Sequence, residues 1–107
     1  MGLQAIQSRF ALEVSKLIIV ADILGYQVTF GDAYRDPRCN YGSAKSKHRK
    51  RLAIDLNLFK DGVWLEKTED HAVLGAYWKS IGGIWGGDFP QTEYSTPDGN
   101  HYEWPEK

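Results

Sequence analysis

The stretch Leu52-Ala53-Ile54-Asp55-Leu56-Asn57-Leu58-Phe59 decides the fold of this chain. Large aliphatic residues occupy every second position, and small or polar residues fall between them. This alternation is typical of a β-strand that turns one face to a hydrophobic core and the other to a different environment. Asp61-Gly62 follows as a strong turn signal, so Val63-Trp64-Leu65 is predicted to pair back on this strand as a short hairpin arm.

Two helices and further strands are predicted on either side of this strand. Apolar residues at three- and four-residue steps predict an amphipathic helix from Ile6 to Leu24, ended by Gly25. A second helix is predicted to start at Thr68 and to stop at Gly82-Gly83. Residues 27–34 and 101–104 alternate as strands do, whereas residues 85–90 are predicted to be an irregular loop with close backbone approach. The predicted class is α+β: two main helices packed on a small, mainly antiparallel sheet.

The composition is that of one soluble domain. Hydrophobic residues make up 42% and charged residues 25% of the 107 positions, an ordinary balance, so residues 1–107 are predicted to form a single domain. The formal net charge of -1 does not indicate a protein that coats nucleic acid. Cys39, the single cysteine, excludes an internal disulfide. No apolar run could span a bilayer, and no signal-peptide cleavage site is recognisable, so we expect no membrane partner.

Three side chains are candidates for one metal site: His48, Asp55 and His101. Asp55 lies in mid-strand on the face opposite the aliphatics, where a buried carboxylate needs a cation or hydrogen-bond donors. A turn could bring His48 back over Asp55, and His101 begins a strand that can lie beside the first. Two imidazoles and one carboxylate leave a fourth position for water, as catalytic zinc requires. Such a combination also occurs by chance, so the residues alone leave a structural interpretation open.

Two acidic residues near His101 have predicted supporting roles. Asp98 precedes His101 by three residues across a Gly-Asn turn, where its carboxylate could accept a proton from metal-bound water. Glu103 shares strand parity with His101 and could orient a ligand ring. His71, the third histidine, is predicted to be a solvated residue in the first turn of the second helix.

Several motifs resemble those of the M15 zinc peptidases. Ser46-Lys47-His48 followed by Leu52-Ala53-Ile54-Asp55 is similar to the S-x-H-x(4)-A-x-D signature of that family. The family contains D-Ala-D-Ala carboxypeptidases and dipeptidases, and phage L-alanyl-D-glutamate endopeptidases that act as endolysins. The similarity covers about Thr29 to Trp104. Further matching motifs are Tyr34-Arg35, Trp85-Gly86-Gly87-Asp88-Phe89 and Asp98-Gly99-Asn100-His101-Tyr102-Glu103, of which the last two resemble the endolysin branch.

The resemblance implies a fold of the M15 or hedgehog-like peptidase type, one Zn²⁺ ion and a peptidoglycan stem peptide as substrate. It assigns zinc binding to His48, Asp55 and His101, the catalytic base to Asp98, and recognition of a substrate carboxylate or carbonyl oxygen to Arg35. Substrate-contacting or supporting positions in the matched motifs are Tyr34, Ser46, Trp85, Asp88 and Glu103.

One position departs from the family pattern in a way that concerns the backbone. Arg51 stands where many members of the family have glycine, three residues after the first histidine. If this position requires a positive φ, an arginine there would be strained.

The predicted function is a phage endolysin of the L-alanyl-D-glutamate peptidase type. A D-Ala-D-Ala carboxypeptidase of the same family and a non-catalytic cell-wall-binding module are the alternatives. An iron facial triad fits poorly, because the first histidine and the carboxylate are seven residues apart. The basic run from Lys45 to Arg51 fits a solvated loop rim better than a nucleic-acid site, and it could also attract an anionic cell wall.

The expected localisation follows from the N-terminal sequence. Because no signal peptide is recognisable, we expect the protein in the host cytoplasm until the membrane is permeabilised.

Overall fold

The computed structural model describes residues 2–33 and 50–106. Four predicted site residues, Tyr34, Arg35, Ser46 and His48, lie outside these ranges. The elements follow in the order α1 (Leu3–Ile23), β1 (Gln27–Phe30), β2 (Ala53–Lys60), β3 (Val63–Leu65), the 3-10 turn η2 (Thr68–His71), α2 (Ala72–Ser80), β4 (Ile84–Trp85), the 3-10 turn η3 (Gly86–Asp88) and β5 (His101–Glu103).

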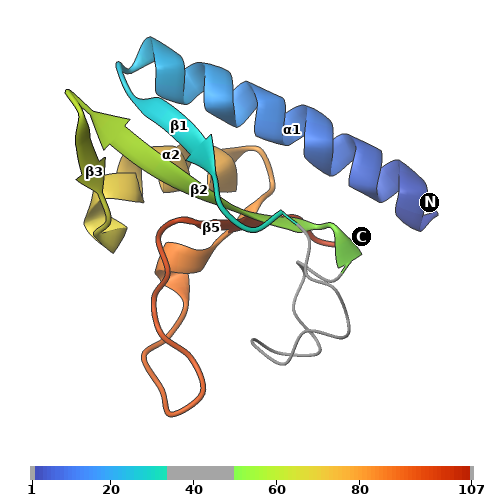
Figure 1. Ribbon diagram of the computed structural model, residues 1–107. Helices are drawn as coiled ribbons and strands as arrows, with labels where there is room; N and C mark the ends of the chain where they lie inside the picture. The colour runs from blue at the N-terminus through green and yellow to red at the C-terminus, as the bar shows by residue number, and fades with distance from the viewer. Residues whose placement is uncertain (1, 34–49, 107) are drawn as a thin grey trace.

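Among the described residues the strand pairs are antiparallel, in the order β1-β2-β5-β4, and β3 pairs with residues Leu58 to Lys60 of β2. The turn between β2 and β3 consists of Asp61 and Gly62, whose φ angles of 52° and 77° are those of a tight hairpin turn. The predicted α+β class and the predicted hairpin are therefore confirmed. Figure 1 shows α1 running beside the sheet, with the hairpin of β2 and β3 extending from it.

The two faces of β2 differ as the alternation predicts. Leu52, Ile54, Leu56 and Leu58 are buried in a core that also contains Phe10 of α1 and Trp78 of α2. Asp55 and Asn57 lie on the opposite face and are partly exposed. Burial of the aliphatic side chains stabilises the fold by about 1.5–3 kcal/mol for each, and it fixes which face is left for polar side chains.

The glycine that follows α1 ends this helix as predicted. Gly25 has a φ of 90°, a conformation that glycine adopts without the steric cost of a side chain. Its N–H donates to the carbonyl of Asp22 at 3.0 Å, and the N–H of Tyr26 donates to that of Ala21 at 2.9 Å. These two bonds satisfy carbonyls at the helix end and direct the chain into β1.

The second helix starts later than the sequence predicts. Thr68 opens the 3-10 turn η2, and the α-helix begins only at Ala72. The Asp70 carboxylate accepts a hydrogen bond from the Lys67 N–H at 3.1 Å, which favours a tight turn in front of the helix. None of the helices in residues 2–33 and 50–106 is long and apolar enough to cross a membrane.

The prediction of an irregular loop over residues 85–90 is wrong for residues 85–88 and is confirmed for Phe89 and Pro90. Trp85 belongs to β4 and pairs with Tyr102, and Gly86–Asp88 form the 3-10 turn η3. The close backbone approach expected there is confirmed, because a Cβ on Gly86 would collide with the carbonyl oxygen of Asp98. Contacts with β5 and with the Asp98 turn therefore impose regular structure on a glycine-rich segment.

Candidate metal centre

The pairing of β2 with β5 brings two of the predicted metal ligands together. Asp55 lies directly opposite His101 in the antiparallel register. The Oδ1 atom of Asp55 is 3.4 Å from Nδ1 of His101. The Asp55 backbone is held on its other side, since its N–H donates to the carbonyl of Asp32 and its carbonyl accepts from Gly31. Main-chain bonds to neighbouring segments thus fix the position of this carboxylate.

The imidazole of His101 is held between two carboxylates. Its Nε2 lies 2.8 Å from Oε1 of Glu103, while Nδ1 faces Asp55, and the residue is only 8% exposed. Burial by itself lowers the pKa of His101, but the hydrogen bonds to Asp55 and Glu103 outweigh it and raise the pKa to about 9. Glu103 therefore has the position of a residue that orients the ring and leaves Nδ1 toward Asp55.

Asp98 joins these two residues. One ligand atom each from Asp55, Asp98 and His101 can be chosen so that all three lie within 4.8 Å of one another. We call these three residues the Asp-Asp-His cluster. Two carboxylates and one imidazole are donors that suit a divalent cation such as zinc. The predicted ligand His48 lies outside the described residues, so its part in the site stays a prediction.

The turn that carries Asp98 is fixed by hydrogen bonds to two other segments, Trp85–Gly86 and Thr68. The Asp98 N–H donates to the carbonyl of Gly86 at 2.9 Å. The Gly99 N–H donates to Oγ1 of Thr68 at 3.2 Å, and the Gly99 carbonyl accepts from Nε1 of Trp85 at 2.8 Å. Thr68 is a residue of the site that the sequence does not predict, because its pattern indicates only a helix start. It lies 31 positions before Gly99, and no local pattern connects the two.

Trp85 and Asp88 differ in their relation to the site. Trp85 is buried and bonds directly to the turn that carries Asp98, so it supports the site from beneath. Asp88 forms an ion pair with Nζ of Lys79 in α2 at 2.9 Å and is half exposed. Asp88 is not part of the Asp-Asp-His cluster.

The prediction of a solvated His71 is wrong. The side chain is only 2% exposed, and its Nδ1 lies 2.8 Å from the hydroxyl of Tyr102. Burial lowers the pKa of His71 to about 4, so the ring is neutral near pH 7. The reason is tertiary: the tight turn η2 directs this ring inward to Tyr102, which lies 31 residues further along the chain.

Arg51 meets the condition for backbone strain that its position in the M15 pattern suggests. Its φ is 56°, in the left-handed region that glycine adopts readily and other residues adopt at a cost. The arginine directly precedes the segment that carries Asp55. Arg51 therefore adopts the left-handed backbone conformation at the position where many members of the M15 family have glycine.

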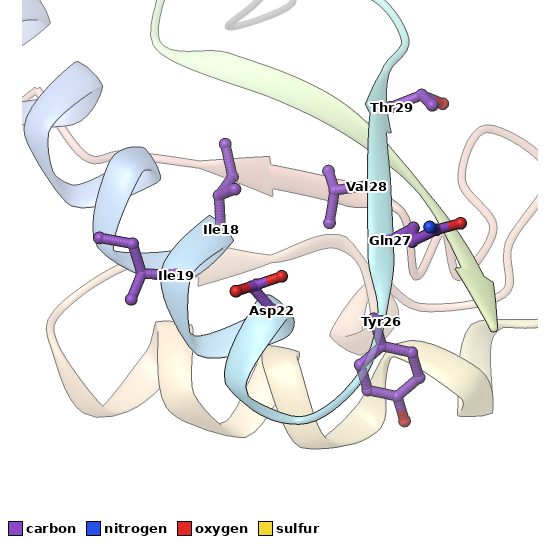
Figure 2. A pocket seen from close by; sticks show the side chains of 7 residues that line it. All are labelled: Ile18, Ile19, Asp22, Tyr26, Gln27, Val28 and Thr29. Carbon is purple, nitrogen blue, oxygen red and sulfur yellow. The ribbon is translucent and has the colours of Figure 1, made fainter.

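Two hollows differ in their relation to the cluster. One, of about 480 Å³, is lined in part by Asp98, Asn57 and Trp64 and adjoins the cluster. The other, of about 650 Å³, lies between α1 and β1 and is shown in Figure 2, where Val28 points from the strand toward the helix. Because no residue of the cluster lines the second hollow, only the first is placed to receive a ligand of the site.

The comparison with known families gives one match. Residues 40–104, more than half of the chain, match the sequence model of an M15 peptidase family described as D-alanyl-D-alanine carboxypeptidase. No curated protein matches the chain closely enough to count as a relative. The matched range contains Asp55, Asp98 and His101, the three residues of the cluster.

Proposed function

This chain belongs to the M15 peptidase family, and from that membership we propose that it is a zinc-dependent enzyme that hydrolyses the peptide stems of bacterial peptidoglycan. The observation that carries the proposal is the Asp-Asp-His cluster, whose ligand atoms approach within 4.8 Å. Membership makes the protein a hydrolase of peptide bonds. The identity of the ion and of the substrate belongs to the proposal.

The donor atoms of the cluster fit zinc. Nε2 of His101 lies against Glu103, so Nδ1, which faces Asp55, is the nitrogen that would bind the ion. In the proposed arrangement, Asp55, His101 and His48 hold the ion and leave a fourth position for water. When bound, zinc would lower the pKa of its water and polarise the scissile carbonyl.

Asp98 is the proposed general base. It is more exposed than Asp55 or His101, so it lies on the side that substrate can reach. Its carboxylate takes a proton from the attacking water as the oxygen bonds to the carbonyl carbon, and it delivers that proton to the amine as the carbon–nitrogen bond breaks. Arg35, proposed from the family motif alone, would bind a substrate carboxylate or carbonyl oxygen.

The proposed subtype is a phage endolysin that cleaves the L-alanyl-D-glutamate bond. The support is the resemblance of the Trp85–Phe89 block and of the Asp98–His101 ending to that branch. The alternative is a D-Ala-D-Ala carboxypeptidase, which the description of the matched family favours. In the endolysin proposal the protein stays in the host cytoplasm until the membrane is permeabilised.

The substitution Asp98→Asn tests the proposed base. Zinc content should be unchanged, because Asp98 is not one of the proposed ligands. Turnover of defined muropeptides, followed by mass spectrometry, should fall by about 10²–10⁴-fold. Asp22→Asn is the matched control: it makes the same chemical change on an exposed aspartate of α1, outside both the cluster and the hollow beside it, and should retain full turnover.

The outcomes separate the roles of Asp98. Full activity in Asp98→Asn would contradict the proposed base. Loss of zinc together with activity would make Asp98 a ligand instead. A wild-type protein that releases no fragment from purified cell walls with zinc present would contradict the proposed function as a whole.

A further inference from the structure

The groove beside Asp98 contains features that the chemistry of peptide hydrolysis does not use. Its volume is about 480 Å³, and it extends from the Asp-Asp-His cluster toward the β2–β3 hairpin. Besides Asp98, its lining residues are Asn57, Trp64, Leu65, Glu66, Lys67, His71 and Asn100. A substrate whose scissile bond lies at Asp98 would place its adjoining part in this groove.

Trp64 is the most distinctive residue of the groove. Its partner across the hairpin is Phe59, which shares a face of β2 with Asp55 and Asn57. Trp64 therefore lies on the face of the sheet that carries the cluster. It is 54% exposed, although Trp78, Trp85 and Trp104 are packed in or against the core. An exposed indole beside a candidate active site is a platform on which a flat apolar surface can bind.

Polar groups surround this platform. Asn57 and Asn100 are partly buried and offer amide donors and acceptors along the groove. The side chain of Asn57 is oriented by a hydrogen bond from its Nδ2 to Oγ1 of Thr29 at 3.3 Å. The fitting occupant therefore has one apolar face and a rim of hydrogen-bonding groups.

The charges of the groove disfavour an anion. Glu66 and Asp98 contribute two acidic groups against the single cation of Lys67, and His71 is neutral near pH 7. A neutral sugar ring meets the requirement better than a carboxylate, because a pyranose has a C–H face and carries hydroxyl and acetamido groups at its edge.

We propose that this groove binds an N-acetylated pyranose of the glycan strand, with its C–H face on Trp64 and its polar groups on Asn57 and Asn100. The inference rests on the proposed function, which makes peptidoglycan the substrate. In peptidoglycan the sugar is joined through a lactyl group to L-alanine, the first residue of the stem. A sugar in this groove therefore places the L-alanyl-D-glutamate bond at Asp98, whereas the D-Ala-D-Ala bond lies several residues further from the sugar.

A pair of substrates tests the inference. One is N-acetylmuramyl-L-alanyl-γ-D-glutamyl-L-lysine, and the other is the same tripeptide with an acetyl group in place of the sugar. In the wild-type protein the sugar should lower KM. Trp64→Ala should raise KM for the sugar substrate by about tenfold, with kcat and the sugar-free substrate unchanged, and Trp64→Phe should restore most of the difference.

Val63→Ala is the matched control, since it truncates the exposed neighbour of Trp64 on the opposite face of the same strand. It should alter KM for neither substrate. Equal effects of Trp64→Ala on both substrates would show that the groove holds the peptide, and no effect on either would show that it holds no part of the substrate; both results would overturn the inference.

A binding measurement separates this inference from the proposed function. N-acetylmuramyl-L-alanine, the sugar-containing fragment released by cleavage after L-alanine, is titrated calorimetrically into zinc-loaded wild-type protein and Trp64→Ala. Weaker binding of the fragment to Trp64→Ala supports the inference that the sugar binds in the groove, even if the wild-type protein hydrolyses nothing. If the wild-type protein hydrolyses stem peptides but both proteins bind the fragment equally, the inference that the groove binds the sugar is wrong, whereas the proposed function is still supported.

Discussion

The two faces of the sheet at β2 and β5 differ in environment, although the residues that form them are neighbours in the sequence. On one face Ile54, Leu56 and Tyr102 are buried among aliphatic and aromatic side chains. On the other, Asp55 and His101 hold a carboxylate and an imidazole 3.4 Å apart. Because successive strand residues point to opposite faces, a slip of one residue in register would move the charges into the core. The core thus fixes the register on which the candidate metal centre depends.

Trp78 connects the two faces. Its ring is fully buried and packs edge to face against Phe10, Tyr102 and Trp104, with centroid distances of 6.1, 6.0 and 5.3 Å. Its Nε1 donates at 2.9 Å to the carbonyl of Glu103, the residue whose side chain contacts His101. The core therefore supports the strand that orients the imidazole.

The largest expected effect comes from Trp78→Ala. Removing a fully buried indole from a close-packed core should lower the free energy of unfolding by about 3–5 kcal/mol. Trp64→Ala removes the same side chain from the exposed hairpin and should change it by less than about 0.5 kcal/mol. Urea denaturation of the two variants measures the contrast. Equal losses would mean that the core is not centred on α2.

The next effect is on the pH dependence of stability in metal-free protein. The pKa of His71 is lowered to about 4 from 6.5, so between these values the unfolded chain binds more protons and stability rises with pH, by about 1 kcal/mol per pH unit at most. The pKa of His101 is raised to about 9, so above pH 6.5 the folded chain binds more protons and stability falls with rising pH. We expect maximal stability near pH 6.5.

Urea titrations of metal-free protein at acid, neutral and alkaline pH measure this profile. His71→Gln should reduce the pH dependence on the acid side alone. Tyr102, which contacts His71, directs its side chain to the face of β5 opposite that of His101, and Asp70, which raises the pKa of His71, does not act on the pKa of His101. Zinc bound to Nδ1 of His101 would displace the proton between that ring and Asp55. The fall of stability with rising pH above pH 6.5 should then become smaller. If the loss of stability at acid pH persists in His71→Gln, that loss is caused by protonation of the carboxylates and not by His71.

The parts of the fold that could be predicted from the sequence depend on local signals. The alternation of residues 52–59, the glycine that ends α1 and the Asp61-Gly62 turn each act through neighbouring residues. The 3-10 turn at Gly86 and the burial of His71 could not be predicted, because contacts with Asp98 and Tyr102 impose them. The proximity of Asp55 and His101 was predictable as strand pairing, whereas the support of Asp98 by Thr68 was not.

The smallest expected effect concerns Thr68, whose side chain bonds to the turn that carries Asp98. Thr68→Val keeps the shape of the side chain but removes the oxygen that accepts from the Gly99 N–H, so the free energy of unfolding should fall by about 1 kcal/mol. Thr68→Ser keeps the acceptor and should recover most of that loss. If the bond serves mainly to hold Asp98, Thr68→Val should lower kcat by more than its loss of stability explains and should leave KM unchanged. Thr68→Ser should restore kcat. Equal turnover by both variants in the folded state would confine the role of Thr68 to the turn itself.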